Sequence, residues 1–275
     1  MNRTDRPSIN STRNPRVKAA ISLQKKRDRD RLGLIIVEGT REVARALEAG
    51  MDPVEAFVCT SVSEGPAIED IAVTLAAKGS DLFEVSPVVY GKLAYRRSTE
   101  GVVAVFKKPE ESLSSFTTRQ APLYLVVDGV EKPGNLGAVF RSADGAGVDG
   151  IIVTGKGTDL YNPNVIRASL GTVFDIHSAV ATATEAMRWL KERKIRTIVA
   201  TPAAEHLYHE ADLTSQCAIV VGSEDRGASR EYIDSADQLV RLPMRGIADS
   251  LNVSVSASIL VYESLRQRTI AGRKQ

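Results

Sequence analysis

The sequence predicts an α/β protein with two domains, the second built on a mostly parallel sheet. Short apolar runs alternate with helical stretches along the whole chain, as in α/β proteins. In the second half these runs are continuously apolar, which is typical of parallel strands covered on both faces. The length of 275 residues is enough for two ordinary domains.

The N-terminal half is predicted to form one compact α/β module. A charged stretch with a broken apolar stripe predicts a first helix over residues 16–31. After it we expect strands at 34–37, 56–59, 82–85 and 102–106, with helices at 41–49, 68–78 and 87–94. Residues 107–119 (KKPEESLSSFTTR) lack periodicity and are rich in Pro, Ser, Thr and charge. We therefore divide the chain into residues 1–107, a linker at 108–119, and residues 120–275.

The C-terminal half continues with longer elements. Strands are expected at 123–127, 151–153, 195–200 and 219–221, with a shorter candidate at 239–242. Helices are expected at 136–145, 164–169, 184–193, 230–235 and 253–268. This order of strands and helices is the pattern of a parallel sheet with crossover helices.

The charge is distributed unevenly along the chain. Residues 1–31 contain ten Lys and Arg against three Asp, whereas the net charge of the whole chain is only +2. Such a segment indicates contact with a polyanion, although a solvated helix face would look the same. Since no aromatic residues are interleaved, phosphate and shape contacts are expected rather than base stacking. The residues assigned to this polyanion contact are Arg13, Arg16, Lys18, Lys25, Lys26 and Arg27.

Several classes of protein and site are excluded. No segment is apolar over the length of a membrane span, and the first residues lack the apolar stretch of a secretory signal. Cys59 and Cys217 are isolated in apolar runs, which favours buried thiols in a cytoplasmic protein. His206 and His209 have no third matched ligand, so no metal is expected.

The first chemistry-bearing stretch is DGVEKPGNLGAVFR, residues 128–141, which follows a predicted strand and opens a helix. A helix N-terminus offers free amides to an anion, and Arg141 lies near it in sequence with Asn135. The spacing fits neither a dinucleotide fingerprint nor a P-loop. An ordinary strand-to-helix turn with Arg141 in a salt bridge is the alternative.

The second stretch is IVVGSEDRG, residues 219–227, where a buried strand ends in Gly222 and is followed by polar residues. Open α/β proteins bind ligands at the carboxyl ends of parallel strands. Gly222 is suited to backbone contact with a ligand, and Glu224 to a hydrogen bond or salt bridge.

The third stretch is the polar loop of residues 245–252, between an apolar run and a helix of small residues. Both flanks read as buried, and a loop inside a protein must satisfy its own amides. We therefore expect it to hold a nucleotide-like cofactor, with Thr201 contributing from the end of another strand. An ordinary connection in which Ser250 or Asn252 caps the helix is the alternative.

Together, in this order, the three stretches resemble the signature motifs of the SpoU/TrmH family of RNA ribose 2′-O-methyltransferases, in the SPOUT superfamily. The matching residues are Asn135, Gly137 and Arg141 in NLGAVFR, Val221 to Glu224, and Leu242 to Met244 with the run SLNVSV from Ser250. Asp225 departs from the family pattern, in which a small or basic residue is common. The leading module resembles the substrate-binding domain of ribosomal RNA members.

The resemblance implies a C-terminal α/β knot, in which the chain threads a loop into a trefoil, and a homodimer whose sites are completed across subunits. It implies S-adenosylmethionine as the cofactor. The residues implied to bind it are Thr201, Gly222, Leu242, Met244, Ser250, Leu251 and Asn252.

The reaction needs the alkoxide that develops at the ribose oxygen to be stabilised and its proton removed. A guanidinium does not readily release a proton, so we assign Arg141 as clamp and oxyanion stabiliser, with a phosphate or carboxylate as proton acceptor. Asn135 and Glu224 would orient Arg141 or the substrate, and Asn252 with Ser250 would shape the cofactor loop.

The substrate implied is 23S ribosomal RNA, because transfer-RNA members usually lack the leading module. Three alternatives stay open: a transfer RNA 2′-O-methyltransferase, a non-catalytic knotted RNA-binding protein, and a phosphate- or nucleotide-binding α/β protein. Affinity for S-adenosylmethionine separates the last from the others.

Overall fold

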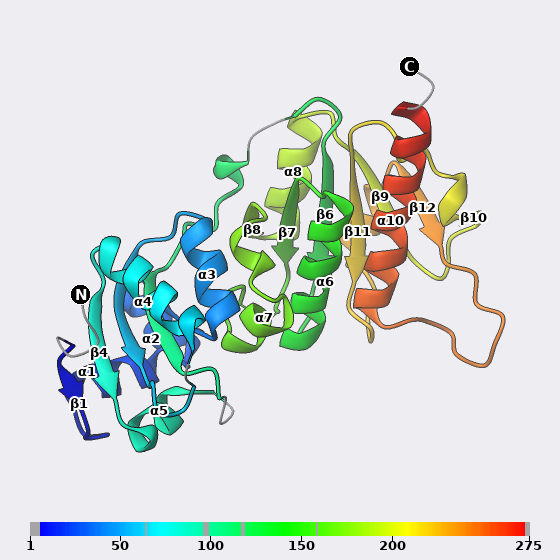
Figure 1. Ribbon diagram of the computed structural model, residues 1–275. Coiled ribbons are helices and arrows are strands. Elements are labelled where there is room, and N and C mark those ends of the chain that lie inside the picture. Colours follow the sequence, from blue (N-terminus) through cyan, green and yellow to red (C-terminus); the bar gives the residue numbers. More distant parts are fainter. Residues whose placement is uncertain (1–5, 64, 96–98, 117–118, 158, 273–275) are drawn as a thin grey trace. The chain divides into compact units, whose positions relative to one another are not determined.

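The computed structural model describes residues 6–63, 65–95, 99–116, 119–157 and 159–272. The chain forms two compact units (Figure 1). The first contains Met1–Pro109 together with Asp159–Asp175, and the second contains Glu110–Thr158 and Ile176–Gln275. The first unit therefore includes a segment that the sequence analysis placed in the C-terminal domain.

A five-stranded mixed sheet forms the centre of the first unit. Its order is β1 (Ser8–Ile9), β4 (Asp81–Val85), β3 (Pro53–Val58), β5 (Val102–Lys107) and β2 (Leu34–Glu38). β1, β4 and β3 are parallel, whereas β5 is antiparallel to both of its neighbours. The helices are α1 (Pro15–Ser22), α2 (Lys26–Leu32), α3 (Thr40–Glu48), α4 (Pro66–Ala77) and α5 (Pro87–Leu93).

The single helix predicted over residues 16–31 is wrong, because α1 and α2 are separate helices. The break follows from the burial of Leu23, which ends α1 and packs into the core. The carbonyl oxygen of Leu23 accepts a 2.6 Å hydrogen bond from Nη1 of Arg29, which is itself buried in α2. β1 was not predicted, since two residues carry no periodic signal.

The segment Asp159–Asp175 contains α7 (Pro163–Ala168), begun by the side chain of Asn162, and a 3₁₀ turn at Thr172–Phe174. Three polar contacts hold it within the first unit. Nη2 of Arg29 donates to both carboxylate oxygens of Asp159 at 2.9 and 3.1 Å. Nδ2 of Asn164 donates to the hydroxyl of Tyr95 at 2.9 Å, and Nη1 of Arg45 donates to the carbonyl oxygen of Leu170 at 2.6 Å.

The second unit contains a seven-stranded sheet, and every pairing in it is parallel. The predicted parallel sheet is therefore confirmed. Its order is β10 (His206–Leu207), β12 (Gln238–Arg241), β9 (Arg196–Ala200), β11 (Cys217–Gly222), β6 (Leu123–Asp128), β7 (Gly150–Thr154) and β8 (Ser178–Ala181). β8 and β10 were not predicted, because SAVA is short and β10 has only two residues.

Helices cover both faces of this sheet. α6 (Pro133–Ala146) and α10 (Val253–Gly272) lie side by side on one face (Figure 1). On the other face α8 (Ala183–Glu192) and α9 (Arg230–Asp234) pack over a core that includes Trp189, Tyr232 and Tyr124. Among the described residues, no helix combines the length and the apolar character that a membrane span requires.

Candidate active site

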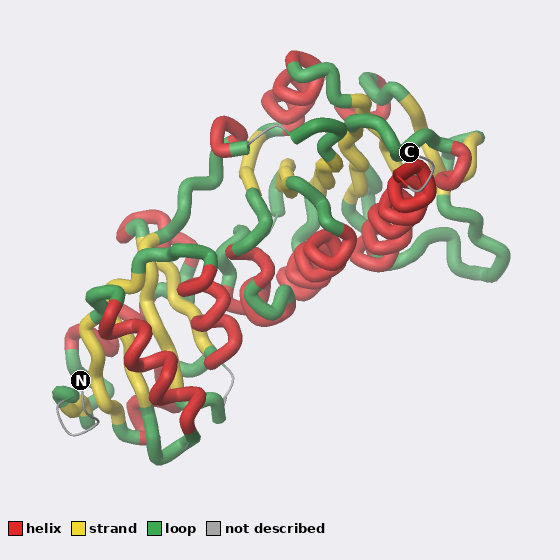
Figure 2. The backbone as a smooth tube through the Cα atoms, turned by 45° about the horizontal axis from the view of Figure 1, so that its top comes forward, coloured by secondary structure: helices red, strands yellow, loops and turns green. Residues whose placement is uncertain are grey.

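The polar residues singled out in the sequence gather at one edge of the seven-stranded sheet. β6, β11, β9 and β12 are parallel neighbours, so the loops that follow them begin at the same edge. These loops carry the motif residues that follow Asp128, Gly222, Ala200 and Arg241 in the chain. The loop between β12 and α10 stands out from the rest of the unit (Figure 2).

Three side chains from the three motifs are bonded to one another. Oε1 of Glu224 accepts hydrogen bonds from Nδ2 of Asn135, at 3.0 Å, and from Nδ2 of Asn252. Nδ2 of Asn252 also approaches Oδ1 of Asn135 at 3.2 Å. Oδ1 of Asn252 accepts from the backbone and hydroxyl of Ser254, so the same side chain begins α10. The structure thus brings three of the four predicted catalytic residues together.

A fourth residue, Lys132, completes this group. Its Nζ lies 3.0 Å from Oε2 of Glu224, the oxygen that the asparagines leave free. The hydrogen bond from Lys132 is the main reason that the pKa of Glu224 lies below its usual value, and the same bond raises the pKa of Lys132. Glu224 is therefore an ionised acceptor at neutral pH. Sequence reasoning missed Lys132, whose only signal was its place just before Pro133 at the start of a helix.

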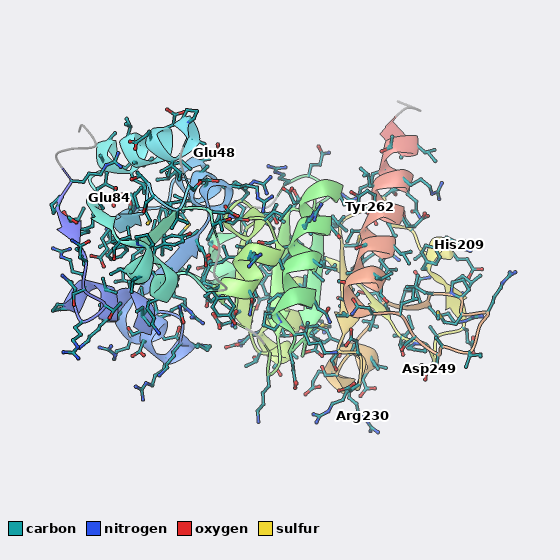
Figure 3. The ribbon with its side chains drawn as sticks, turned by 60° about the horizontal axis from the view of Figure 1, so that its bottom comes forward. Glu48, Glu84, His209, Arg230, Asp249 and Tyr262 are labelled. Carbon is teal, nitrogen blue, oxygen red and sulfur yellow. The ribbon has the colours of Figure 1, made fainter. Side chains whose placement is uncertain are left out.

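A cavity of about 540 Å³ opens beside this group, and its volume is in the range of sites for small ligands. Its walls include six of the seven residues predicted to bind the cofactor: Thr201, Gly222, Leu242, Met244, Ser250 and Leu251. The seventh, Asn252, lies between Leu251 and Val253, which both line the cavity. Figure 3 shows Asp249, another wall residue, on the loop that precedes α10.

The residues of this cavity fit S-adenosylmethionine. Leu242, Met244 and Leu251 supply apolar surface, and strand ends supply backbone donors and acceptors for an adenosine. The negative carboxylates of Glu224, Asp225 and Asp249 line the same cavity and would attract the positive sulfonium of the cofactor.

Gly222 has a steric role that the sequence did not reveal. A Cβ at this position would lie 1.9 Å from the backbone nitrogen of Ala228 and 1.9 Å from the carbonyl carbon of Gly227. The chain returns so closely because residues 223–227 form a tight turn, in which Ser223 pairs with Gly227. Gly222 thus allows the turn that carries Glu224 to fold back against the end of β11.

A second cavity, of about 640 Å³, adjoins the first. It is lined by the loop after β6, by Gly155 and Lys156 after β7, and by the far side of the Ser223–Gly227 turn. Both cavities are lined by Glu224, so this carboxylate stands on their common wall. The buried Asp128 also borders the second cavity, where it accepts hydrogen bonds from Thr154 Oγ1 and from the backbone of Ser229, each at 2.8 Å.

Arg141 is not part of the bonded group. Its side chain is exposed on α6, and no hydrogen bond or ion pair joins it to another described residue. Six residues separate it from Asn135, which at about 100° per residue places the two side chains on different faces of the helix. The alternative of a salt bridge within the chain is therefore wrong for the described residues.

The loop at residues 245–252 is not buried within a single chain, contrary to the prediction from its flanks. All of its residues are exposed except Leu251, which is partly covered. The apolar flanking segments suggested a buried loop, but only one side of the loop faces the cavity, through Asp249, Ser250 and Leu251.

The six predicted RNA-contact residues are all exposed in the first unit. Two of them are paired with acids: Arg16 with Glu55 and Asp81 at 3.0 Å, and Lys26 with Asp30 at 2.6 Å. Among the described residues no ion pair engages the other four, Arg13, Lys18, Lys25 and Arg27. Of the six, these four are therefore the most available to a polyanion.

A parallel sheet with a ligand-sized cavity at the carboxyl ends of its strands defines an α/β protein that binds a nucleotide-like ligand there. The family model described as the SpoU rRNA Methylase family matches residues 122–262, and the MRM3-like substrate binding domain matches residues 14–104. The chain belongs to the SpoU rRNA methylase family.

Individual relatives agree with this assignment. The chain is 31% identical to the 23S rRNA (guanosine-2′-O-)-methyltransferase RlmB of Pectobacterium atrosepticum, over 85% of this chain and 98% of that one. It is 43% identical to the solved structure of an RNA 2′-O ribose methyltransferase, with a TM-score of 0.83 over 95% of this chain and 99% of the other. The AviRb methyltransferase of Streptomyces viridochromogenes, solved with AdoMet, gives a TM-score of 0.87 at 27% identity, over 94% and 99%. The predicted family and α/β class are confirmed.

Proposed function

We propose that the protein transfers the methyl group of S-adenosylmethionine to a ribose 2′-hydroxyl of 23S ribosomal RNA. The observation that carries this function is the juxtaposition of the 540 Å³ cavity with the Asn135–Glu224–Asn252 group, in a chain of the SpoU rRNA methylase family. Relatives named as 23S rRNA 2′-O-methyltransferases, and a related structure with AdoMet bound, support the substrate and the cofactor.

The cofactor supplies an electrophilic methyl group on a positively charged sulfur. Thr201, Gly222, Leu242, Met244, Ser250 and Leu251 hold it through the walls of the cavity. The Asn252 side chain fixes the end of the loop by bonding to both Glu224 and Ser254. If the methyl group of the bound cofactor lies near Glu224, the ribose hydroxyl can approach it from the opposite side of this cavity wall.

The chain's own residues then act on the hydroxyl. The ribose oxygen forms a bond to the methyl carbon while the carbon–sulfur bond breaks, its electron pair stays on sulfur, and the hydroxyl proton leaves to an acceptor. Glu224 and Asn135 orient the hydroxyl, and Arg141 stabilises the negative charge that develops on its oxygen. Glu224 or an RNA phosphate takes the proton, since Arg141 cannot.

We also propose a homodimer in which Arg141 reaches the site of the partner subunit. α10 exposes an apolar stripe of Val255, Tyr262 and Leu265, which are 45%, 49% and 36% exposed. Spacings of seven and three residues put the three on one face of the helix, and Figure 3 shows Tyr262 there. The exposed Arg141 lies on the neighbouring helix α6.

The C-terminal knot stays a prediction of the family resemblance.

The N-terminal unit is proposed to bind the RNA. The unpaired cations of α1, α2 and their flanks support phosphate contacts, and the match to a substrate-binding domain supports recognition by this unit. The two free, buried cysteines and the ribosomal substrate are consistent with a cytoplasmic protein.

The test is calorimetric titration with S-adenosylmethionine, followed by transfer of radiolabelled methyl to unmodified 23S rRNA. Saturable binding and label at a single alkali-resistant dinucleotide are expected, because a 2′-O-methyl group blocks cleavage at its ribose. Label only in transfer RNA would support the transfer RNA alternative. Binding without transfer to either RNA would support a non-catalytic protein, and no binding would contradict the proposed cofactor.

A further inference from the structure

The second cavity is the strongest feature that the motif residues leave without an assigned role. It is as large as the cofactor cavity and lies on the other side of the Ser223–Gly227 turn. The two cavities share the turn residues Ser223–Gly227 and Val253, and among these Glu224 carries the carboxylate that is hydrogen-bonded to Asn135 and Asn252. A methyl acceptor must approach the methyl group from the side opposite the sulfur, so the two reactants need adjoining sites.

We propose that the second cavity holds the target nucleotide, with Lys156 as a phosphate contact. This assignment rests on the methyl transfer proposed above. The ribose would lie at the common wall, within reach of Glu224 and Asn135, and the 5′ or 3′ phosphate would lie toward Lys156.

The charges around the cavity fit this orientation. Its cations are Lys132, Lys156 and Arg226, and its carboxylates are Asp128, Glu131, Glu224 and Asp225. Asp128 is buried and doubly hydrogen-bonded, and Glu224 is bonded to Lys132, Asn135 and Asn252. No ion pair engages Lys156 or Arg226 among the described residues, so their charges are available to an anion.

The two glycines beside Lys156 approach the loop after β6 closely. Gly155 has a φ of +75°, and a Cβ there would lie 3.0 Å from Oδ1 of Asp128. A Cβ at Gly157 would lie 2.8 Å from the carbonyl oxygen of Val130. The two glycines therefore lay the chain directly on the loop after β6, with Lys156 between them on the cavity wall.

The ribose end of the cavity is acidic and amide-rich, as a hydroxyl requires. Oε2 of Glu224 accepts a hydrogen bond from Lys132 at 3.0 Å, and Lys132 is largely exposed. An RNA phosphate that attracts Lys132 would free this oxygen to accept a hydrogen bond from the 2′-hydroxyl. The cavity thus offers cations for the phosphate and a carboxylate for the sugar, which matches a nucleotide and not a free anion.

The test compares Lys156→Met with Lys191→Met, a matched control on the exposed face of α8. Steady-state methyl transfer to 23S rRNA is measured over a range of salt concentrations, with S-adenosylmethionine affinity measured by calorimetry. Lys156→Met is expected to raise the KM for RNA about tenfold and to reduce the salt dependence by about one phosphate contact, with cofactor affinity unchanged. Lys156→Arg should restore most of the RNA affinity, since it keeps the charge.

A second variant, Lys156→Trp, tests the cavity itself by placing a bulky side chain at its wall. It is expected to abolish transfer while S-adenosylmethionine still binds. Equal behaviour of Lys156→Met and Lys191→Met, or full activity of Lys156→Trp, would overturn the assignment. Absence of transfer by the wild-type protein would instead overturn the proposed function, and this inference with it.

Discussion

Glu224 is the residue on which the candidate site depends. One of its oxygens joins Asn135 and Asn252, and the other binds Lys132, so a single carboxylate links three separate loops. Hydrogen bonds to an ionised group are stronger than those between neutral groups, so the arrangement is weakened when Glu224 loses its charge. Protonation would remove both its attraction for Lys132 and its capacity to accept a proton.

Replacement of Lys132 is therefore expected to change the pH dependence of the enzyme. The hydrogen bond from Lys132 is the largest cause of the lowered pKa of Glu224. In Lys132→Met this pKa should rise toward its usual value, so that Glu224 becomes protonated at a higher pH. The acidic limb of kcat/KM, which reports groups of the free enzyme, should shift to higher pH. An unshifted limb in Lys132→Met, with Lys191→Met as control, would show that Glu224 need not be ionised.

The sequence predicted Asn135, Glu224 and Asn252 because motif order makes them recognisable, and the structure joins them. It did not predict Lys132 or Lys156, because a lone lysine beside a proline or between glycines looks like any exposed lysine. The role assigned to Arg141 stays a prediction, since helical periodicity places its side chain on a different face of α6 from Asn135.

At the scale of elements, the strands that form continuous runs of large apolar residues could be predicted. β6, β7, β9 and β11 are short apolar runs buried on both faces, and composition alone predicts them. β1, β8 and β10 have two to four residues, so their pairing depends on neighbours distant in sequence. The break between α1 and α2 depends on Arg29 binding the carbonyl of Leu23, a tertiary contact without local signal.

The end of β11 should tolerate no side chain at position 222. In Gly222→Ala the new Cβ would collide with backbone atoms of Gly227 and Ala228, which cannot rotate away as a side chain could. The turn bearing Glu224 must then shift, and we expect at least a tenfold loss of S-adenosylmethionine affinity and a melting temperature several degrees lower. Calorimetry and thermal unfolding measure both.

Gly91→Ala in α5 is the matched control, because nothing lies within 4 Å of a Cβ at that position. It should leave cofactor affinity unchanged and stabilise the helix by about 0.5–1 kcal/mol. Normal cofactor binding by Gly222→Ala would show that the turn is more adaptable than its close backbone packing implies.

At the scale of the whole molecule, the proposed dimer predicts complementation between inactive variants. Arg141→Ala and Asn252→Ala would each inactivate a homodimer. If each site takes Arg141 from one chain and Asn252 from the other, a mixed dimer contains one intact site. Random exchange of the two variants should then restore about a quarter of wild-type turnover, measured after co-expression. No recovery would place Arg141 and Asn252 of each site on the same chain.

The segment Asp159–Asp175 limits how this protein can be divided. A fragment ending at Pro109 would lack Asp159, leaving the buried Arg29 guanidinium without its carboxylate, and it would lack α7, which covers β2. An unpaired buried charge costs about 3–5 kcal/mol, which is a large share of the stability of a domain. Exchange of the N-terminal units between related enzymes by recombination in the linker would therefore separate residues that fold together. Besides the crossover in the linker, a functional chimera needs two further crossovers, one before Asp159 and one after Asp175, so that this segment is exchanged together with the N-terminal unit.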